Sequence, residues 1–140
     1  MKLIVRAVGK MRDRRMEELC KEYLERVRRH LPAEVVEVED DAALVEQLPA
    51  GAEVIALEPG GASWTTDELM RFISERMLRG ARALVFLIGG AEGMSPATVA
   101  RAGRRLSLSP LTLPHRLARV ILCEQLYRCV SAIRGEPYHK

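Results

Sequence analysis

The spacing of hydrophobic residues changes period several times along this chain, and each period predicts a different element. Residues 3–8 are apolar apart from Arg6, as expected for a buried strand. Apolar side chains then recur every three or four residues, the pattern of an amphipathic helix, at Met16, Leu19, Cys20, Tyr23 and Val27. Residues 34–39 consist of valine and glutamate only, and we predict a second strand there. Asp40 and Asp41 are suited to cap a short helix that ends near Leu48.

The same signals continue through the second half of the chain. Residues 54–57 predict a third strand, which Pro59-Gly60-Gly61 is expected to end. Thr65 and Glu68 match the capping box S/T-x-x-E, so a helix is expected to begin there, with its buried stripe and glycine cap at Leu69, Phe72, Ile73, Met77 and Gly80. The remaining predicted elements are strands over residues 82–88 and 105–108, a helix from Ser95-Pro96 to Gly103, and a long helix over residues 116–133.

Strands and helices alternate throughout, which predicts an α/β fold with a mostly parallel sheet and helices on both faces. The 140 residues suffice for one domain, 1–140, and are too few for two ordinary ones. The longest aliphatic and aromatic run, Leu84–Ile88, is far too short to cross a bilayer. Charges at Lys2 and Arg6 fall where a signal peptide needs an apolar stretch. We therefore expect a cytoplasmic protein that makes no use of a membrane.

Charge is distributed unevenly along the chain. The net charge is only +3, but 18 of the 22 basic residues are Arg, clustered within residues 12–15, 26–29, 101–105 and 116–119. Any one cluster is expected to be solvated surface, whereas four in a small domain indicate a polyanionic partner, because the arginine fork suits phosphate. Cys20, Cys123 and Cys129 follow no C-x-x-C pattern, so we expect small buried side chains and no metal site.

Two segments carry most of the candidate chemistry, and the first is a glycine turn. The apolar run 84–88 leads into Gly89-Gly90-Ala91-Glu92-Gly93, and the end of a strand is where α/β proteins hold cofactors. The turn matches neither G-x-x-x-x-G-K-[ST] nor G-x-G-x-x-G, which excludes a P-loop nucleotide hydrolase and disfavours a nicotinamide dehydrogenase. Either these glycines form only a tight turn, or they let a ligand approach the backbone closely.

The second segment, residues 107–115, is apolar and is interrupted by Pro110 and Pro114. Its leucines could sandwich a flat apolar ring, while free backbone N–H and C=O groups pair with the edge of the ring. Adenine presents one donor and one acceptor on that edge. The alternative is an irregular loop that only covers the core. We predict that this segment and the glycine turn form two walls of one ligand pocket.

The residues of both segments also resemble a known family. The resemblance rests on residues 87–95, 107–109 and 111–115, on Arg119 with residues 124–128, and on the terminal Pro137-Tyr138-His139-Lys140. Residues 1–3 and 7–10 fit as well. Over its whole length the chain resembles the RlmH family, the large-subunit ribosomal RNA pseudouridine N3-methyltransferases of the SPOUT superfamily.

This resemblance implies a sheet whose C-terminal part is threaded into a trefoil knot, against the general rarity of knots. It implies S-adenosylmethionine as cofactor, held by three loops that carry Leu57, Gly89, Gly90, Leu108, Ser109, Pro110, Leu111, Thr112 and Leu113. It implies a homodimer that packs partly through the last helix. The substrate would be N3 of a pseudouridine in 23S ribosomal RNA within the assembled ribosome.

The chain departs from the family pattern in three places. Glu39 leads almost directly into Asp40-Asp41, where relatives carry a Gly/Lys-rich loop. Residues 58–61 lack the lysine of the pattern D-x-x-G-K, and Lys140 stands where many members end in arginine. These differences affect the expected RNA contacts more than cofactor binding.

The implied reaction requires N3 of the base to lose a proton. His139 is the first candidate for general base or proton relay, because the ordinary pKa of histidine lies near neutral pH. Tyr138, Arg128 and Glu92 are further candidate catalytic residues, whereas His115 is expected to be structural. Two other functions stay open: a non-enzymatic, ribosome-associated RNA-binding protein on the same fold, and an α/β nucleotide-binding sensor.

Overall fold

The computed structural model describes residues 1–139, which form one five-stranded sheet. The strands are β1 (Lys2–Val8), β2 (Ala33–Val38), β3 (Ala52–Ser63), β4 (Ala83–Ile88) and β5 (Arg104–Ser107), in the spatial order β2-β1-β4-β3-β5. All pairings between these strands are parallel, so the predicted α/β class is confirmed. The trefoil knot stays a prediction.

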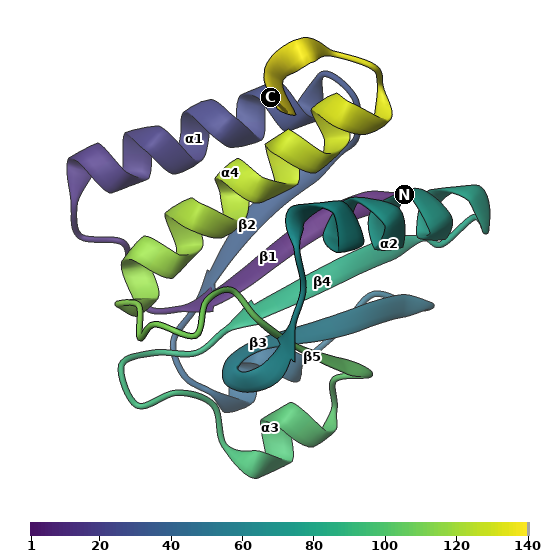
Figure 1. Cartoon of the computed structure of the whole chain (residues 1–140). Coiled ribbons are helices and arrows are strands. Elements are labelled where there is room, and N and C mark those ends of the chain that lie inside the picture. The colour runs from purple at the N-terminus through teal and green to yellow at the C-terminus, as the bar shows by residue number, and fades with distance from the viewer. Residues whose placement is uncertain (140) are drawn as a thin grey trace.

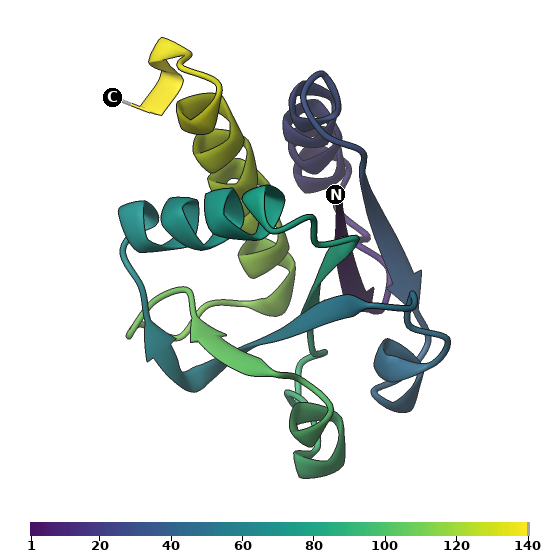
Figure 2. The same ribbon diagram turned by 90° about the vertical axis from the view of Figure 1, so that its right-hand side faces the viewer.

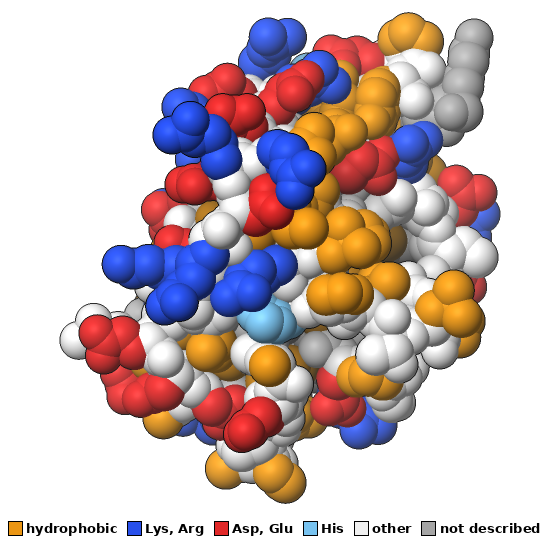
Figure 3. Space-filling model, turned by 90° about the vertical axis from the view of Figure 1, so that its left-hand side faces the viewer, with side chains coloured by type: hydrophobic (Ala, Val, Ile, Leu, Met, Phe, Trp, Pro, Cys, Tyr) orange, Lys and Arg blue, Asp and Glu red, His pale blue; other side chains and the backbone are white. Residues whose placement is uncertain are grey.

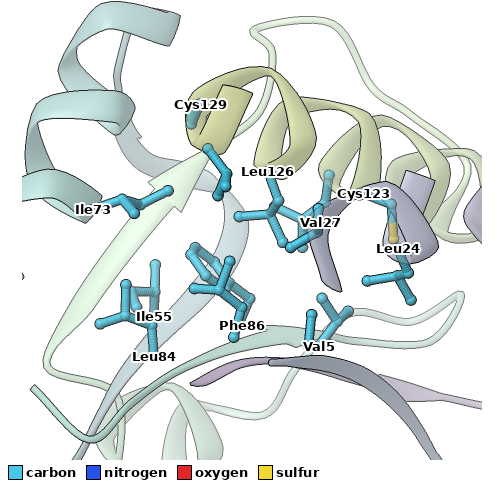
Figure 4. Packing of buried hydrophobic residues seen from close by; sticks show 14 of the residues in the cluster. Val5, Leu24, Val27, Ile55, Ile73, Leu84, Phe86, Cys123, Leu126 and Cys129 are labelled. Carbon is cyan, nitrogen blue, oxygen red and sulfur yellow. The ribbon is translucent and has the colours of Figure 1, made fainter. Parts of the chain in front are cut away.

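Helices cover the two faces of the sheet unequally. α1 (Arg14–Arg28), α2 (Thr66–Leu78) and α4 (His115–Ile133) lie on one face, while α3 (Pro96–Ala100) and the 3₁₀ helix η1 (Ala42–Val45) lie on the other (Figure 1 and Figure 2). The last described turn is the 3₁₀ helix η2 (Pro137–His139). Every side chain of the central strand β4 is buried, because both faces are covered. Phe86 of β4 packs below α4 near Leu126 (Figure 4).

The helix starts predicted from the sequence are confirmed by their caps. The Thr65 side chain accepts from the Glu68 N–H and the Glu68 side chain accepts from the Thr65 N–H, which completes the capping box. Ser95 caps α3, with proline in the first turn. The stripe predicted for α1 is partly wrong, since Leu19 is 42% exposed. The buried positions are 20, 24 and 27, so the face of α1 that meets the core is rotated away from Leu19.

β3 does not end at Pro59-Gly60-Gly61, and that prediction is wrong. The strand continues to Ser63, and its pairing with β5 shifts register between Leu57 and Ala62. The extra residues form an irregularity in the ladder, which bends a strand. A Cβ on Gly61 would lie 2.6 Å from the Leu106 nitrogen, so only glycine fits where β3 meets β5.

The helix predicted from Asp40 to about Leu48 is only the 3₁₀ turn η1. Gln47 has φ of 49°, which is incompatible with a continuing right-handed helix. Arg6 of β1 provides the physical reason. Its guanidinium donates to the carbonyls of Leu44, Glu46 and Gln47, at 3.2, 2.5 and 3.1 Å, so these carbonyls bond to a strand side chain instead of a following helical turn.

Asp41 ties η1 to the start of α3. Its carboxylate accepts hydrogen bonds from the Ser95 N–H and hydroxyl, at 3.1 and 2.7 Å, and from the Thr98 hydroxyl at 2.6 Å. Burial raises the pKa of Asp41, but these hydrogen bonds outweigh it and hold the pKa below its ordinary value.

We expect Asp41→Ala to lower the free energy of unfolding by about 1–3 kcal/mol at neutral pH, as measured by urea denaturation. A depressed native pKa makes this contribution present above about pH 4, and it is lost as pH falls through the native pKa. The stability difference between the variant and the unmodified chain should therefore shrink below pH 4. A difference that stays constant from pH 7 to 3 would contradict this role.

The structure of residues 1–139 bears on the cysteines, on metal binding and on membrane-spanning helices. Cys20, Cys123 and Cys129 are buried and form no disulfide, as expected of small apolar side chains. In this part of the chain no group of three or more His, Cys, Asp or Glu residues could hold a metal ion. No helix there is long and apolar enough to cross a membrane.

Candidate functional site

The carboxyl ends of β3, β4 and β5 meet at one edge of the sheet. Leu57 of β3 pairs with Ile88 of β4 on one side and with Leu106 of β5 on the other. Because the strands are parallel, residues 89–95 and 108–114 leave the sheet at this edge, beside residues 58–59, where the pairing of β3 with β5 is interrupted. In open α/β sheets this is the edge where ligands bind.

These segments enclose a pocket of about 860 Å³, a volume typical of small-molecule sites. Eight of the nine predicted cofactor residues line it, namely Leu57, Gly89, Gly90, Leu108, Ser109, Leu111, Thr112 and Leu113. Pro110 belongs to the same loop but does not line the pocket. The glycine turn and the proline-bracketed loop therefore form walls of one pocket, while the identity of its ligand stays a prediction.

Five further lining residues belong to the two predicted walls, namely Ala91, Gly93, Ser107, Pro114 and His115, the last of which the sequence marked as structural. Sequence reasoning missed the lining residues Glu58, Pro59, Ile88, Met94 and Ala118. Most of them could have been found because they are next to predicted lining residues in the sequence. Ala118 follows His115 by three residues, so the two share one face of α4. Burial, and then the charges of Arg116 and Arg119, lower the pKa of His115, which is therefore neutral at pH 7.

The glycine turn after β4 is closed by its own backbone. The Gly93 N–H donates to the Gly90 carbonyl at 3.0 Å, and Gly93 has φ of 76°. A Cβ on Gly89 would lie 2.8 Å from the Gly93 carbonyl carbon and 3.0 Å from Met94 Cγ. Glycine at position 89 is thus required by the turn itself. Any substitution there must move the wall of the pocket.

The loop after β5 is held by two serines. The Ser107 hydroxyl donates to the Ser109 carbonyl, and the Leu111 N–H donates to the Ser109 hydroxyl, both at 2.9 Å. The backbone groups of Thr112 and Leu113 form no hydrogen bond with the rest of residues 1–139. They are therefore available to a ligand, as the sequence predicted for the edge of an adenine ring.

Arg119 fixes the start of α4 beside the pocket. It is only 2% exposed, and it donates to Glu37 Oε2 at 2.6 Å and to the Gly9 carbonyl at 3.0 Å. Glu37 also accepts from the Met11 N–H at 2.9 Å. The Arg116 side chain donates to the Lys10 carbonyl at 3.3 Å. These contacts bring the basic loop after β1 against the start of α4, the part of the molecule seen in Figure 3, where Lys and Arg side chains gather beside a histidine.

The predicted catalytic residues do not meet within one chain. Glu92 lines the pocket. Arg128 and Tyr138 lie near the other end of α4, where Arg128 pairs with Glu124 at 2.6 Å and the Tyr138 hydroxyl donates to Glu124 at 3.2 Å. Ten helical residues separate Ala118 from Arg128, a distance of about 15 Å along α4. The tail therefore docks on its own helix, away from its own pocket.

The surroundings of Tyr138 limit its possible role in the reaction. Burial first, and then hydrogen bonding with Tyr23, raise the pKa of Tyr138 to about 12. Tyr138 therefore stays protonated at neutral pH and is suited to donate a hydrogen bond, not to remove a proton. The side chain of His139, the first candidate for general base, and the whole of Lys140 lie outside the described residues.

Comparisons with known proteins match the whole described chain. The family described as "Predicted SPOUT methyltransferase" matches residues 1–139. The ribosomal RNA large subunit methyltransferase H of Sorangium cellulosum is 43% identical to this chain, over 99% of each. Proteins of the same name from Gemmatimonas aurantiaca and Carboxydothermus hydrogenoformans are 38% and 39% identical over the full length of both chains.

Proposed function

The chain belongs to the SPOUT methyltransferase family, and we propose that it transfers a methyl group from S-adenosylmethionine to N3 of a pseudouridine in large-subunit ribosomal RNA. The relatives named as ribosomal RNA large subunit methyltransferases, 38–43% identical over at least 99% of both chains, support large-subunit ribosomal RNA as the substrate. Ribosomal RNA within the assembled ribosome is the proposed partner, which would place the enzyme in the cytoplasm.

The pocket at the ends of β3, β4 and β5 is the observation that carries this proposal. Its volume of about 860 Å³ suits a nucleoside with an attached amino acid. The unpaired backbone groups of Thr112 and Leu113 suit the edge of adenine, and Leu57, Leu108 and Leu113 supply apolar walls. α4 begins at the pocket without a side-chain cap, so its positive end would favour a carboxylate.

When bound, S-adenosylmethionine would supply an electrophilic methyl group. The protein's part is then to orient the acceptor in line with that methyl group and to take up the N3 proton. Among the catalytic candidates whose side chains the structure describes, only Glu92 lines the chain's own pocket, and its carboxylate could accept that proton or orient the base. Arg128 and Tyr138 do not line this pocket and could act there only from another chain.

A second copy of the chain would resolve this separation, and we propose a homodimer in which the tail of one protomer completes the pocket of its partner. Leu117 of α4 is exposed and Ile121, one turn further, is partly exposed, so α4 lacks a fully polar outer face. A band of hydrophobic side chains crosses the same side of the molecule as the basic cluster (Figure 3). Burying that band would place the two chains' α4 helices at their interface.

Glu124 offers a test of the dimer. Its side chain is 18% exposed and holds both Arg128 and Tyr138. We expect Glu124→Ala to weaken dimerisation by about 3–5 kcal/mol, because a partly buried arginine would lose its partner. Sedimentation at low protein concentration measures the change, with Glu18→Ala on the exposed side of α1 as control. An unchanged mass would refute the role of Glu124 in the interface.

Calorimetry with S-adenosylmethionine separates the three functions that the sequence left open. Micromolar binding to the unmodified chain supports the methyltransferase. No cofactor binding, combined with tight binding to ribosomes, would instead indicate a non-enzymatic RNA-binding protein. Binding of another nucleotide but not of S-adenosylmethionine would indicate a nucleotide sensor.

A further inference from the structure

A second, smaller groove lies on the outer side of α2 and the start of the edge strand β5. It encloses about 370 Å³ and is lined by Trp64, Phe72, four arginines and two glutamates. It shares no lining residue with the larger pocket. The methyltransferase reaction described above makes no use of it.

The charges in this groove do not balance. Glu75 pairs with Arg79 at 2.7 Å and with Arg76 at 3.5 Å, and Arg76 also pairs with Glu53 at 2.7 Å. Arg71 and Arg104 have no acidic partner among residues 1–139. The groove therefore carries two guanidinium groups without an ion-pair partner and one such carboxylate, Glu68, which accepts from the Thr65 N–H, so one positive charge remains in excess.

One of these groups is already held in place. The guanidinium carbon of Arg104 lies 5.1 Å from the centre of the Phe72 ring and 6.0 Å from that of Trp64. Such cation–π contacts position the side chain without neutralising it. Arg104 can thus bind a phosphate with less loss of side-chain freedom than an ordinary surface arginine. The adjacent Arg105 differs, because Glu58 neutralises it at 2.7 Å.

The strand β5 connects this groove to the cofactor pocket. Arg104 begins the strand in the groove, and Ser107 ends it in the wall of the pocket. Three residue steps of a strand cover about 10 Å. That is a span of only a few nucleotides, so RNA with its target base at the pocket would place a neighbouring phosphate near Arg104.

We propose that the groove at Trp64 and Arg104 binds the RNA strand that flanks the target nucleotide, with Arg104 and Arg71 contacting its phosphates. This inference rests on the proposed function and adds a substrate contact outside the pocket. Trp64 is partly exposed, so its indole could stack against an unpaired base, which favours RNA over an acidic protein segment.

The test compares Arg104→Ala with Arg79→Ala, a control in the same groove whose charge Glu75 already neutralises. For Arg104→Ala we expect the KM for ribosomes to rise about tenfold, with kcat little changed. Affinity for S-adenosylmethionine, measured by calorimetry, should be unchanged. The dependence of ribosome binding on salt should fall by about one unit of slope, as for loss of one phosphate contact. Arg79→Ala should change none of these quantities.

Ribosome binding is measured by cosedimentation, independently of methyl transfer. If the unmodified chain transfers no methyl group, the proposed function fails, whereas the effect of Arg104 on binding can still be measured. Equal binding and equal salt dependence for the two variants would overturn the proposal. It would also be overturned if Arg104→Ala weakened binding to ribosomes but not to a naked ribosomal RNA fragment, because the groove would then contact a ribosomal protein.

Discussion

Replacing Gly89 with alanine is expected to reduce kcat/KM for methyl transfer about a hundredfold, because displacing a positioning wall by about 1 Å can cost that much. The new Cβ would lie 2.8 Å from the Gly93 carbonyl carbon, so the turn after β4 has to move. That turn is the wall of the pocket opposite the loop that carries Leu108 to Leu113. We expect the free energy of unfolding to fall by only about 1–3 kcal/mol, as for other overpacked sites.

Gly103→Ala is the matched control for this experiment. A Cβ at position 103 would meet only the Val54 carbonyl oxygen at 3.9 Å, an ordinary contact, and Gly103 does not line the pocket. Calorimetry with S-adenosylmethionine and a methyl-transfer assay measure both variants. If Gly89→Ala bound the cofactor as well as the unmodified chain, the glycine turn would not be part of the cofactor site.

Removing residues 137–140 is expected to reduce methyl transfer about a thousandfold while cofactor binding is retained. The tail carries Tyr138 and His139, and loss of a general base and its neighbours commonly costs about 10²–10⁴ in rate. The tail docks on its own α4 through Tyr138 and Glu124, and Glu124 lies six residues, about 9 Å along the helix, beyond Ala118 of the pocket. We therefore expect the tail to act on the pocket of the partner.

Mixing two inactive chains tests this arrangement. Chains that lack residues 137–140 are combined with Gly89→Ala chains, after subunit exchange at equal concentrations. If the tail acts across the dimer, about half of the dimers are mixed and each has one complete site, so about a quarter of the normal activity returns. Action within one chain predicts that no activity returns, and that result would contradict the proposed arrangement.

The sequence predicted the order of elements well, because caps and periodicity are local signals. Thr65 with Glu68, and Ser95 with Pro96, define helix starts without reference to the rest of the chain. The errors come from contacts between distant residues. Pro59-Gly60-Gly61 looks like the end of a strand, yet pairing with β5 carries β3 on to Ser63. η1 is short because Arg6, far away in sequence, bonds to its carbonyls.

In the candidate site, too, the residues given by local signals were predicted and those that depend on distant contacts were not. The pocket could be predicted because its walls are loops that directly follow predicted strands, and parallel strands end at one edge. The roles of Arg128 and Tyr138 could not be predicted, because helical spacing places Arg128 along α4 without saying which pocket it serves, and Tyr138 lies in η2, beyond the helix. The role of Arg119 was also missed, since its partners Glu37 and Gly9 lie about 80 residues or more away in sequence.

Transfer of labelled methyl from S-adenosylmethionine to ribosomes that lack this modification tests the central claim most directly, with the modified nucleotide located by mass spectrometry. The proposed function predicts one added methyl group, at N3 of a pseudouridine in the large-subunit RNA of assembled ribosomes, and its loss with Gly89→Ala. No transfer, transfer to another atom or base, or transfer only to free RNA would contradict it.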